Sequence, residues 1–193
     1  MEMDTAALKS MRMKQVVIVN ALLIFFLLSY FLVINHFAIK SSHLFIFLGM
    51  VILVQAVYGL LKGDSTKSLI PFYEKVAIYE REKMGNEWGK QRKVSNYWNL
   101  VLSGLFFLNA YLTRGSSSIV VEADYKFMSI LGLFLLIMVN IASIVHFRKV
   151  DTSTTKIDFK GYTWKSNLIA VVVGIIFAII MIVVVFTYIS TTV

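Results

Sequence analysis

Long apolar runs alternate with shorter polar segments along the chain. A helix that crosses a hydrocarbon core of roughly 30 Å needs about 20 predominantly apolar residues. Five runs meet this requirement, although the third does so only when its interfacial ends are counted. We therefore predict an all-α integral membrane protein, a single domain over residues 1–193 that forms a bundle of five transmembrane helices. The predicted spans are residues 16–38, 44–61, 95–113, 127–146 and 167–189.

The positive charges are distributed unevenly over the polar segments. Sixteen Lys and Arg residues fall in the N-terminal tail and in segments 62–96 and 147–166, against three in segments 39–43 and 113–126. Cytoplasmic loops of membrane proteins carry an excess of Lys and Arg. This alternation predicts a cytoplasmic N-terminus, an external C-terminus and an odd number of spans, which supports the short third span.

The net charge of +8 has the same explanation. Each basic residue near an anionic cytoplasmic leaflet gains roughly 1 kcal/mol, so the bilayer surface is the expected anionic partner. Binding to nucleic acid is not predicted, because the sequence contains no folded basic module or recognisable nucleic-acid-binding motif.

The longest polar segment lies between the second and third runs and contains YEKVAIYEREKMGNEWGKQRK, from Tyr73 to Lys93. Pro71 suits the first turn of a helix, and helix-favouring residues follow it. We therefore predict one cytoplasmic amphipathic helix over residues 69–93. The candidate surface for a protein partner comprises the residues on or beside its apolar face: Tyr73, Ala77, Arg81, Met84 and Trp88.

The carboxylates of this predicted helix have cationic neighbours within four residues, such as Lys83 near Glu80 and Lys90 near Glu87. Pairs at this spacing are typical of a solvated helix face. We therefore expect Glu80, Glu82 and Glu87 to form surface ion pairs rather than a catalytic site. Two interpretations of the helix stay open: it packs against the cytoplasmic ends of its own bundle, or it docks another protein.

The apolar runs contain no Asp, Glu, Lys or Arg. Ionisable groups inside a membrane mark proton relays and ion paths, so the sequence argues against a proton-coupled pump built from this chain alone. The expected helix-packing residues are Asn140 in the fourth span and a ridge of small residues in the fifth, Ala170, Gly174 and Ala178. Such ridges permit close helix approach, either within the bundle or against a second copy.

No catalytic, cofactor-binding or metal-binding residue is predicted. The chain has no cysteine, which excludes disulfides and thiolate ligands. His36 and His43 flank the turn between the first two spans, but a metal site needs a third ligand, and none is near them in sequence. Motifs of serine hydrolases and metalloproteases are not visible.

These observations favour a non-enzymatic interaction protein of the cell membrane. It would be an accessory subunit of a membrane complex, or an immunity-type protein that binds a membrane-active toxin. In general plan the chain resembles small, cysteine-free polytopic proteins of Gram-positive bacteria, which implies a bacterial plasma membrane. The alternative is a membrane subunit of a transporter that works with a separate cytoplasmic ATPase through segment 62–96. An isolated transmembrane enzyme ranks third.

Overall fold

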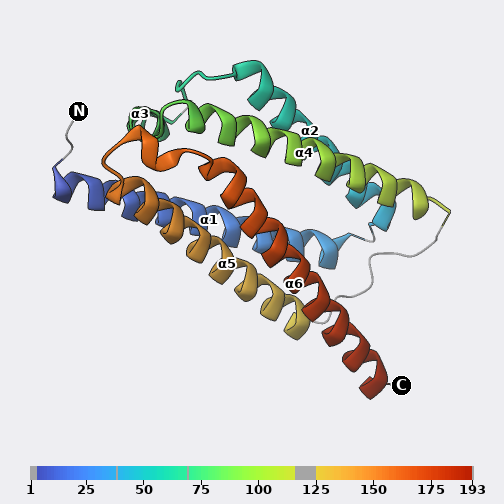
Figure 1. Cartoon of the computed structure of the whole chain (residues 1–193). Coiled ribbons are helices and arrows are strands. Elements are labelled where there is room, and N and C mark those ends of the chain that lie inside the picture. Colours follow the sequence, from blue (N-terminus) through green and yellow to red (C-terminus); the bar gives the residue numbers. More distant parts are fainter. Residues whose placement is uncertain (1–3, 38, 69, 116–124, 193) are drawn as a thin grey trace.

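The computed structural model describes residues 4–37, 39–68, 70–115 and 125–192, and every regular element in these ranges is helical (Figure 1). The elements in chain order are α1 (Thr5–His36), α2 (Ser41–Lys62), α3 (Pro71–Met84), α4 (Asn86–Leu112), α5 (Tyr125–Thr152), the short 3-10 helix η1 (Lys156–Phe159) and α6 (Tyr162–Thr192). Helix α1 begins near α3, whereas α6 ends at the opposite end of the molecule (Figure 1).

Four stretches of the described helices are long and apolar enough to cross a membrane. They are Ala6–Val33, Ser41–Lys62, Gly132–Thr152 and Lys156–Val183. The third predicted span falls in α4, a 27-residue helix whose first turns carry the charged end of segment 62–96. The fold is therefore that of an all-helical, multi-pass membrane protein.

The prediction of one continuous helix over residues 69–93 is wrong, because Gly85 divides the stretch into α3 and the start of α4. Gly85 has φ 60° and ψ −130° and serves as both the C-cap of α3 and the N-cap of α4. Its N–H donates to the Arg81 carbonyl over 2.9 Å. A positive φ is accessible to glycine at little cost, so the chain changes direction here without strain.

The α2–α4 pair forms the most extensive interface between helices, and the two helices lie side by side (Figure 1). Gly49 faces the Phe107 ring, Gly59 faces the Asn96 side chain, and the buried Ser103 hydroxyl donates to the Gly49 carbonyl over 2.9 Å. Small residues let helix backbones approach closely in a membrane. This contact explains why α4 runs along α2 over much of its length.

Helix α1 packs mainly against α5. The side-chain amides of Asn20 and Asn140 exchange hydrogen bonds of 3.0 and 2.8 Å, and Leu27 lies against Gly132. Helix α6 adds a stacked pair of rings, Phe134 and Phe177, with centroids 4.9 Å apart.

The main buried core of the described chain lies at one end of the helices, around α3. It combines residues from α1, α3, α4, α5 and η1: Met11, Val76, Tyr79, Met84, Trp88, Val150 and Phe159. We call this end the cap and define it as residues 5–15, 71–93 and 146–166. The long apolar helices extend from the cap, which therefore fixes their relative positions at that end.

Candidate functional site

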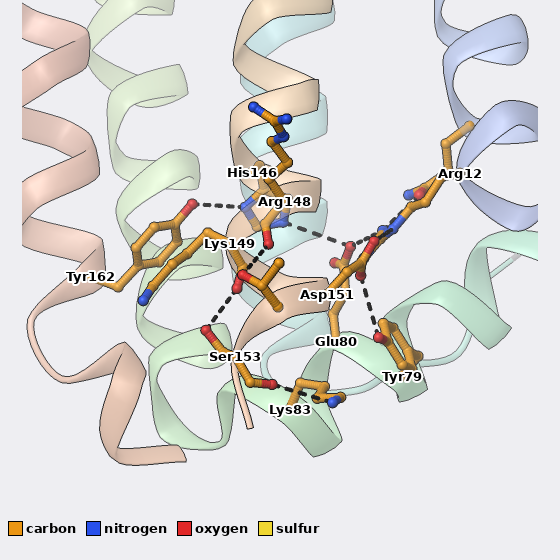
Figure 2. A network of polar contacts seen from close by, with 12 residues as sticks. Arg12, Tyr79, Glu80, Lys83, His146, Arg148, Lys149, Asp151, Ser153 and Tyr162 are labelled. Carbon is orange, nitrogen blue, oxygen red and sulfur yellow. Dashed lines mark hydrogen bonds and ion pairs between the residues drawn. The ribbon is translucent and has the colours of Figure 1, made fainter. Parts of the chain in front are cut away.

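Arg12 lies at the centre of a buried ionic network in the cap (Figure 2). Its Nε and Nη2 donate to the two carboxylate oxygens of Asp151 over 3.1 and 2.7 Å. Its Nη1 donates to Glu80 Oε1 over 2.8 Å and to Gln15 Oε1 over 2.7 Å. The planar guanidinium is suited to such two-pronged binding of a carboxylate, so one side chain joins α1, α3 and α5.

Aromatic rings enclose the Arg12 guanidinium. Its central carbon lies 4.4 Å from the centroid of the Phe147 ring and 5.6 Å from that of Tyr79. The Tyr79 hydroxyl also donates to Asp151 Oδ1 over 3.3 Å. A cation over a ring face is attracted by the ring quadrupole, and more strongly where water is excluded. The side chain of Arg12 is only 9% exposed, so the network lies in such a place.

His146 extends the network to α6 (Figure 2). Its Nε2 lies 3.7 Å from Glu80 Oε1, and its Nδ1 lies 3.0 Å from the Tyr162 hydroxyl. The Glu80 carboxylate thus faces a guanidinium on one side and an imidazole on the other. The chain of contacts from Arg12 to Tyr162 connects four helices through polar atoms alone.

The environment of the network shifts the pKa values of two side chains in α3. Burial by itself raises the pKa of Glu80, but hydrogen bonds and positive charge from His146 and Arg12 outweigh it and lower the pKa below its usual value. Burial and the neighbouring Asp151 carboxylate raise the pKa of Tyr79 to about 12. Glu80 is therefore an anion at neutral pH, and Tyr79 remains a hydrogen-bond donor.

A second polar cluster fixes the start of α6 to the start of α4. The Glu87 carboxylate accepts hydrogen bonds from the Thr163 hydroxyl over 2.8 Å and the Thr163 N–H over 3.2 Å. Lys90 Nζ donates to its other oxygen over 2.8 Å. The hydrogen bond from Lys90 lowers the pKa of Glu87, and the bonds from Thr163 act in the same direction. This cluster positions the first turn of α6.

The expectation that Glu80 forms a solvated ion pair with Lys83 is wrong. The Glu80 side chain is 14% exposed and binds Arg12, whereas Lys83 Nζ donates to the Ser153 carbonyl over 3.3 Å. For Glu87 the expected partner Lys90 is present, but the carboxylate is largely buried against Thr163. Helical spacing identified neighbours on α3 and α4 and missed the partners on other helices.

The predicted partner surface is divided by the fold. Met84 and Trp88 are buried in the cap's own core, Tyr73 and Ala77 are half-buried, and Arg81 is exposed. Met84 and Trp88 therefore agree with the interpretation in which this segment packs against its own bundle. Two residues, Val76 and Tyr79, complete the buried face, and both lay outside the narrow arc of the predicted helix.

The predicted helix-packing residues have different surroundings: Asn140 contacts another helix, whereas the ridge on α6 is exposed. Asn140 binds Asn20 across the α1–α5 contact. The ridge on α6 is exposed: a Cβ added at Gly174 would meet no atom within 4 Å, and Ala170 and Ala178 are exposed as well. At Gly174 no neighbouring helix covers the ridge, so this position is open to lipid or to another polypeptide.

No sequence motif predicted the ionic network around Arg12. Arg12 and Asp151 are separated by 139 positions, and each resembles a surface charge near the edge of an apolar run. The available signal was the position of Arg12 and Asp151 at the same predicted membrane face, four positions before span one and five positions after span four. Within the described ranges, His, Asp and Glu side chains form no group of three that could hold a metal ion.

The arrangement is that of a clamp, in which buried charges with mutual partners hold the helix ends together. Breaking such a pair leaves an uncompensated buried charge and is strongly destabilising. Comparison of the chain with protein-family models, curated proteins and solved structures finds no match.

Proposed function

We propose that the chain crosses a bacterial plasma membrane five times, with the cap and N-terminus in the cytoplasm and the C-terminus outside. The distribution of Lys and Arg supports this orientation, since sixteen fall on the side of the cap and three on the other. The third of these five spans is the apolar second half of α4, which lies along α2. The distance of the end of α6 from the cap also supports an odd number of spans (Figure 1).

Reporter fusions test this topology. Fusions after Lys62, Arg114, Lys149 and Val193 are expected to report inside, outside, inside and outside. A cytoplasmic reporter signal after Val193 would contradict the five-span arrangement.

We infer that the protein acts by binding another membrane protein, as an accessory subunit of a membrane complex or as an immunity-type protein against a membrane-active toxin. One observation carries this proposal: the small-residue ridge of α6 lies exposed, although such ridges suit close helix contact. Lipid fills such a surface less specifically than a helix does. A second helix with a complementary face would restore the contacts that α6 lacks within this chain.

The cap suits this role because it is built for rigidity. The Arg12 network and the Glu87 cluster hold the cytoplasmic ends of the helices, including the first turn of α6. A helix that is fixed at its start, touches α5 through the Phe134–Phe177 pair and leaves Gly174 uncovered presents that face in a defined orientation. Preorganisation of this kind lowers the entropic cost of binding.

The experiment is purification of the tagged protein from gently solubilised native membranes, beside a Gly174→Leu variant. Co-purification of a membrane protein with the parent, and its loss with Gly174→Leu, is the expected result. A Val172→Leu variant is the matched control, because Val172 lies on the other side of α6 and is also exposed. Recovery of a cytoplasmic ATPase that is insensitive to Gly174→Leu would contradict the proposal and favour a transporter subunit.

A further inference from the structure

A hollow of about 280 Å³, with both polar and apolar residues in its wall, lies between α3 and the cap ends of α1, α2 and α4. It is distinct from the ridge on α6, and it borders the ionic network through Glu80 and Gln15. The side chains that give the hollow its polar character come from α1, α2, α4, α3 and the segment between α2 and α3: Gln15, Lys62, Arg92, Tyr73, Thr66 and Ser68.

These side chains are rich in hydrogen-bond donors. Lys62 and Arg92 are cations, and Thr66, Ser68 and Tyr73 carry hydroxyl groups. Burial raises the pKa of Tyr73, which keeps its hydroxyl protonated. The Gln15 carbonyl oxygen accepts from Arg12, which leaves the NH₂ group of the amide as the part able to donate elsewhere. A group with acceptor oxygens and negative charge would match these donors.

The negative charge in the wall of the hollow is already engaged. Glu80 binds Arg12 over 2.8 Å and faces His146, so its carboxylate does not compete strongly for the cations of the hollow. Arg92 donates to the Ser65 carbonyl over 2.8 Å and its guanidinium lies 4.6 Å from the Trp88 ring centroid. These contacts hold Arg92 in place, and its remaining donors stay available. For Lys62, the described part of the chain supplies no anionic partner.

The predicted spans place the hollow at the level where the membrane meets water. Gln15 directly precedes the apolar run 16–38, Lys62 directly follows the run 44–61, and Arg92 lies three positions before the run 95–113. It also lies at the boundary between two helix groups, because α1 packs mainly against α5 while α2 packs along α4. A membrane component can therefore reach it from the bilayer, whichever face of the membrane the cap occupies.

We propose that this hollow binds a phosphate group, carried by the headgroup of an anionic phospholipid. A phosphate offers several acceptor oxygens and negative charge, which match the two cations and three hydroxyls. Basic pockets between transmembrane helices are known sites for anionic headgroups. The proposal does not depend on a protein partner for α6.

The test compares lipid retention by purified parent, Lys62→Gln and Lys67→Gln proteins in zwitterionic detergent. Each is mixed with phosphatidylglycerol, and the bound lipid is counted by native mass spectrometry. Lys67→Gln is the matched control, because Lys67 is an exposed cation of the same segment and does not line the hollow. Thr66→Val is a second variant that keeps all charges. Excess inorganic phosphate, added in parallel, separates a soluble phosphate source from the lipid headgroup.

We expect the parent and Lys67→Gln to retain phosphatidylglycerol equally, and Lys62→Gln to bind it about five- to tenfold more weakly, as loss of one cation near anionic lipid implies. Thr66→Val should also weaken binding. Inorganic phosphate should displace little lipid, since it lacks the acyl chains; full displacement would assign the site to a soluble phosphate compound. Equal retention by Lys62→Gln and the parent, or no retention by the parent, would overturn the proposal.

Discussion

Helices α2 and α6 are both apolar, both long enough to cross a membrane, and both interrupted by small residues. Their surroundings differ. At Gly49 of α2 an added Cβ would lie 3.0 Å from the Phe107 ring, and at Gly59 it would overlap the Asn96 side chain. At Gly174 of α6 it would meet no atom within 4 Å. Glycine in an apolar helix therefore does not by itself identify the packed face.

The difference lies in what the neighbouring helix offers. Helix α4 brings a ring, an amide and a hydroxyl to the glycines of α2, and Ser103 donates to the Gly49 carbonyl. Helix α6 is fixed to the rest of the chain at its start through Thr163 and His146–Tyr162. Further along, Phe177 stacks on Phe134 of α5, but the position of Gly174 is uncovered. In a bilayer, where apolar surface alone drives little association, such specific contacts decide which helices pair.

The largest effect is expected where the chain is held by buried charge. Arg12→Met should lower the free energy of unfolding by about 3–5 kcal/mol, because Glu80 and Asp151 would remain buried without their partner. Lys14→Met is the control, since Lys14 is an exposed cation two residues away. Thermal unfolding in detergent measures both. Equal midpoints for the two variants would show that the network does not stabilise the cap.

The next effect concerns the contact of α2 with α4. Gly59→Leu should cost about 1–3 kcal/mol, because the new side chain would displace Asn96 and separate the helices. Gly104→Leu places the same residue on an exposed position of α4, where an added Cβ meets nothing, and should change stability little. Denaturation of both variants in the same detergent checks the difference. A Gly59→Leu protein as stable as Gly104→Leu would refute this interface.

A smaller effect is expected at the anchor of α6, and it depends on pH. The pKa of Glu87 is lowered in the folded chain, so its contribution is present above the unfolded value of about 4.3 and is lost as the pH falls through the folded value. Glu87→Gln should cost about 1–2 kcal/mol at pH 7. It should also flatten the loss of stability below about pH 4.3. Thermal midpoints of the parent and Glu87→Gln proteins, measured from neutral to acidic pH, check this prediction. The same dependence of the midpoint on pH in both proteins would contradict this assignment.

The smallest effect on the isolated chain is expected at Gly174. Gly174→Leu should leave the unfolding midpoint of the dilute protein unchanged within about 0.5 kcal/mol, as for an exposed surface position. The same change should disrupt association with a partner or a second copy. A destabilised monomer would mean that the ridge packs within the chain, and the contrast between α2 and α6 would disappear.

The sequence predicted the class of fold well because the bilayer imposes lengths that can be read from apolar runs. In the cap, the sequence predicted neither where α3 ends nor which side chain binds Glu80. Gly85 ends α3 through a positive φ, which a count of helix-favouring residues does not detect. Glu80 had a cation at the right helical spacing, yet its partner is Arg12, 68 positions earlier. Local rules describe neighbours on one helix, whereas this carboxylate is bound by a side chain on another.

In the spans as well, the sequence did not identify which helix each packing residue contacts. Asn140 was expected to face another helix, but its partner, Asn20, follows only from the arrangement of α1 beside α5. The ridge on α6 also contains small residues, as the packed face of α2 does, and it lies exposed. An apolar helix is compatible with lipid on every face, so its sequence alone does not select the buried one.

The most direct test of the interaction role places a photoreactive side chain on α6 in native membranes. At position Gly174 we expect a discrete cross-linked protein adduct, because the ridge is exposed in this chain and suited to close helix contact. At position Val172, which is also exposed but lies on the other side of the helix, we expect labelling of lipid only. Adducts of equal yield at both positions, or lipid labelling alone at Gly174, would contradict the proposed role of α6.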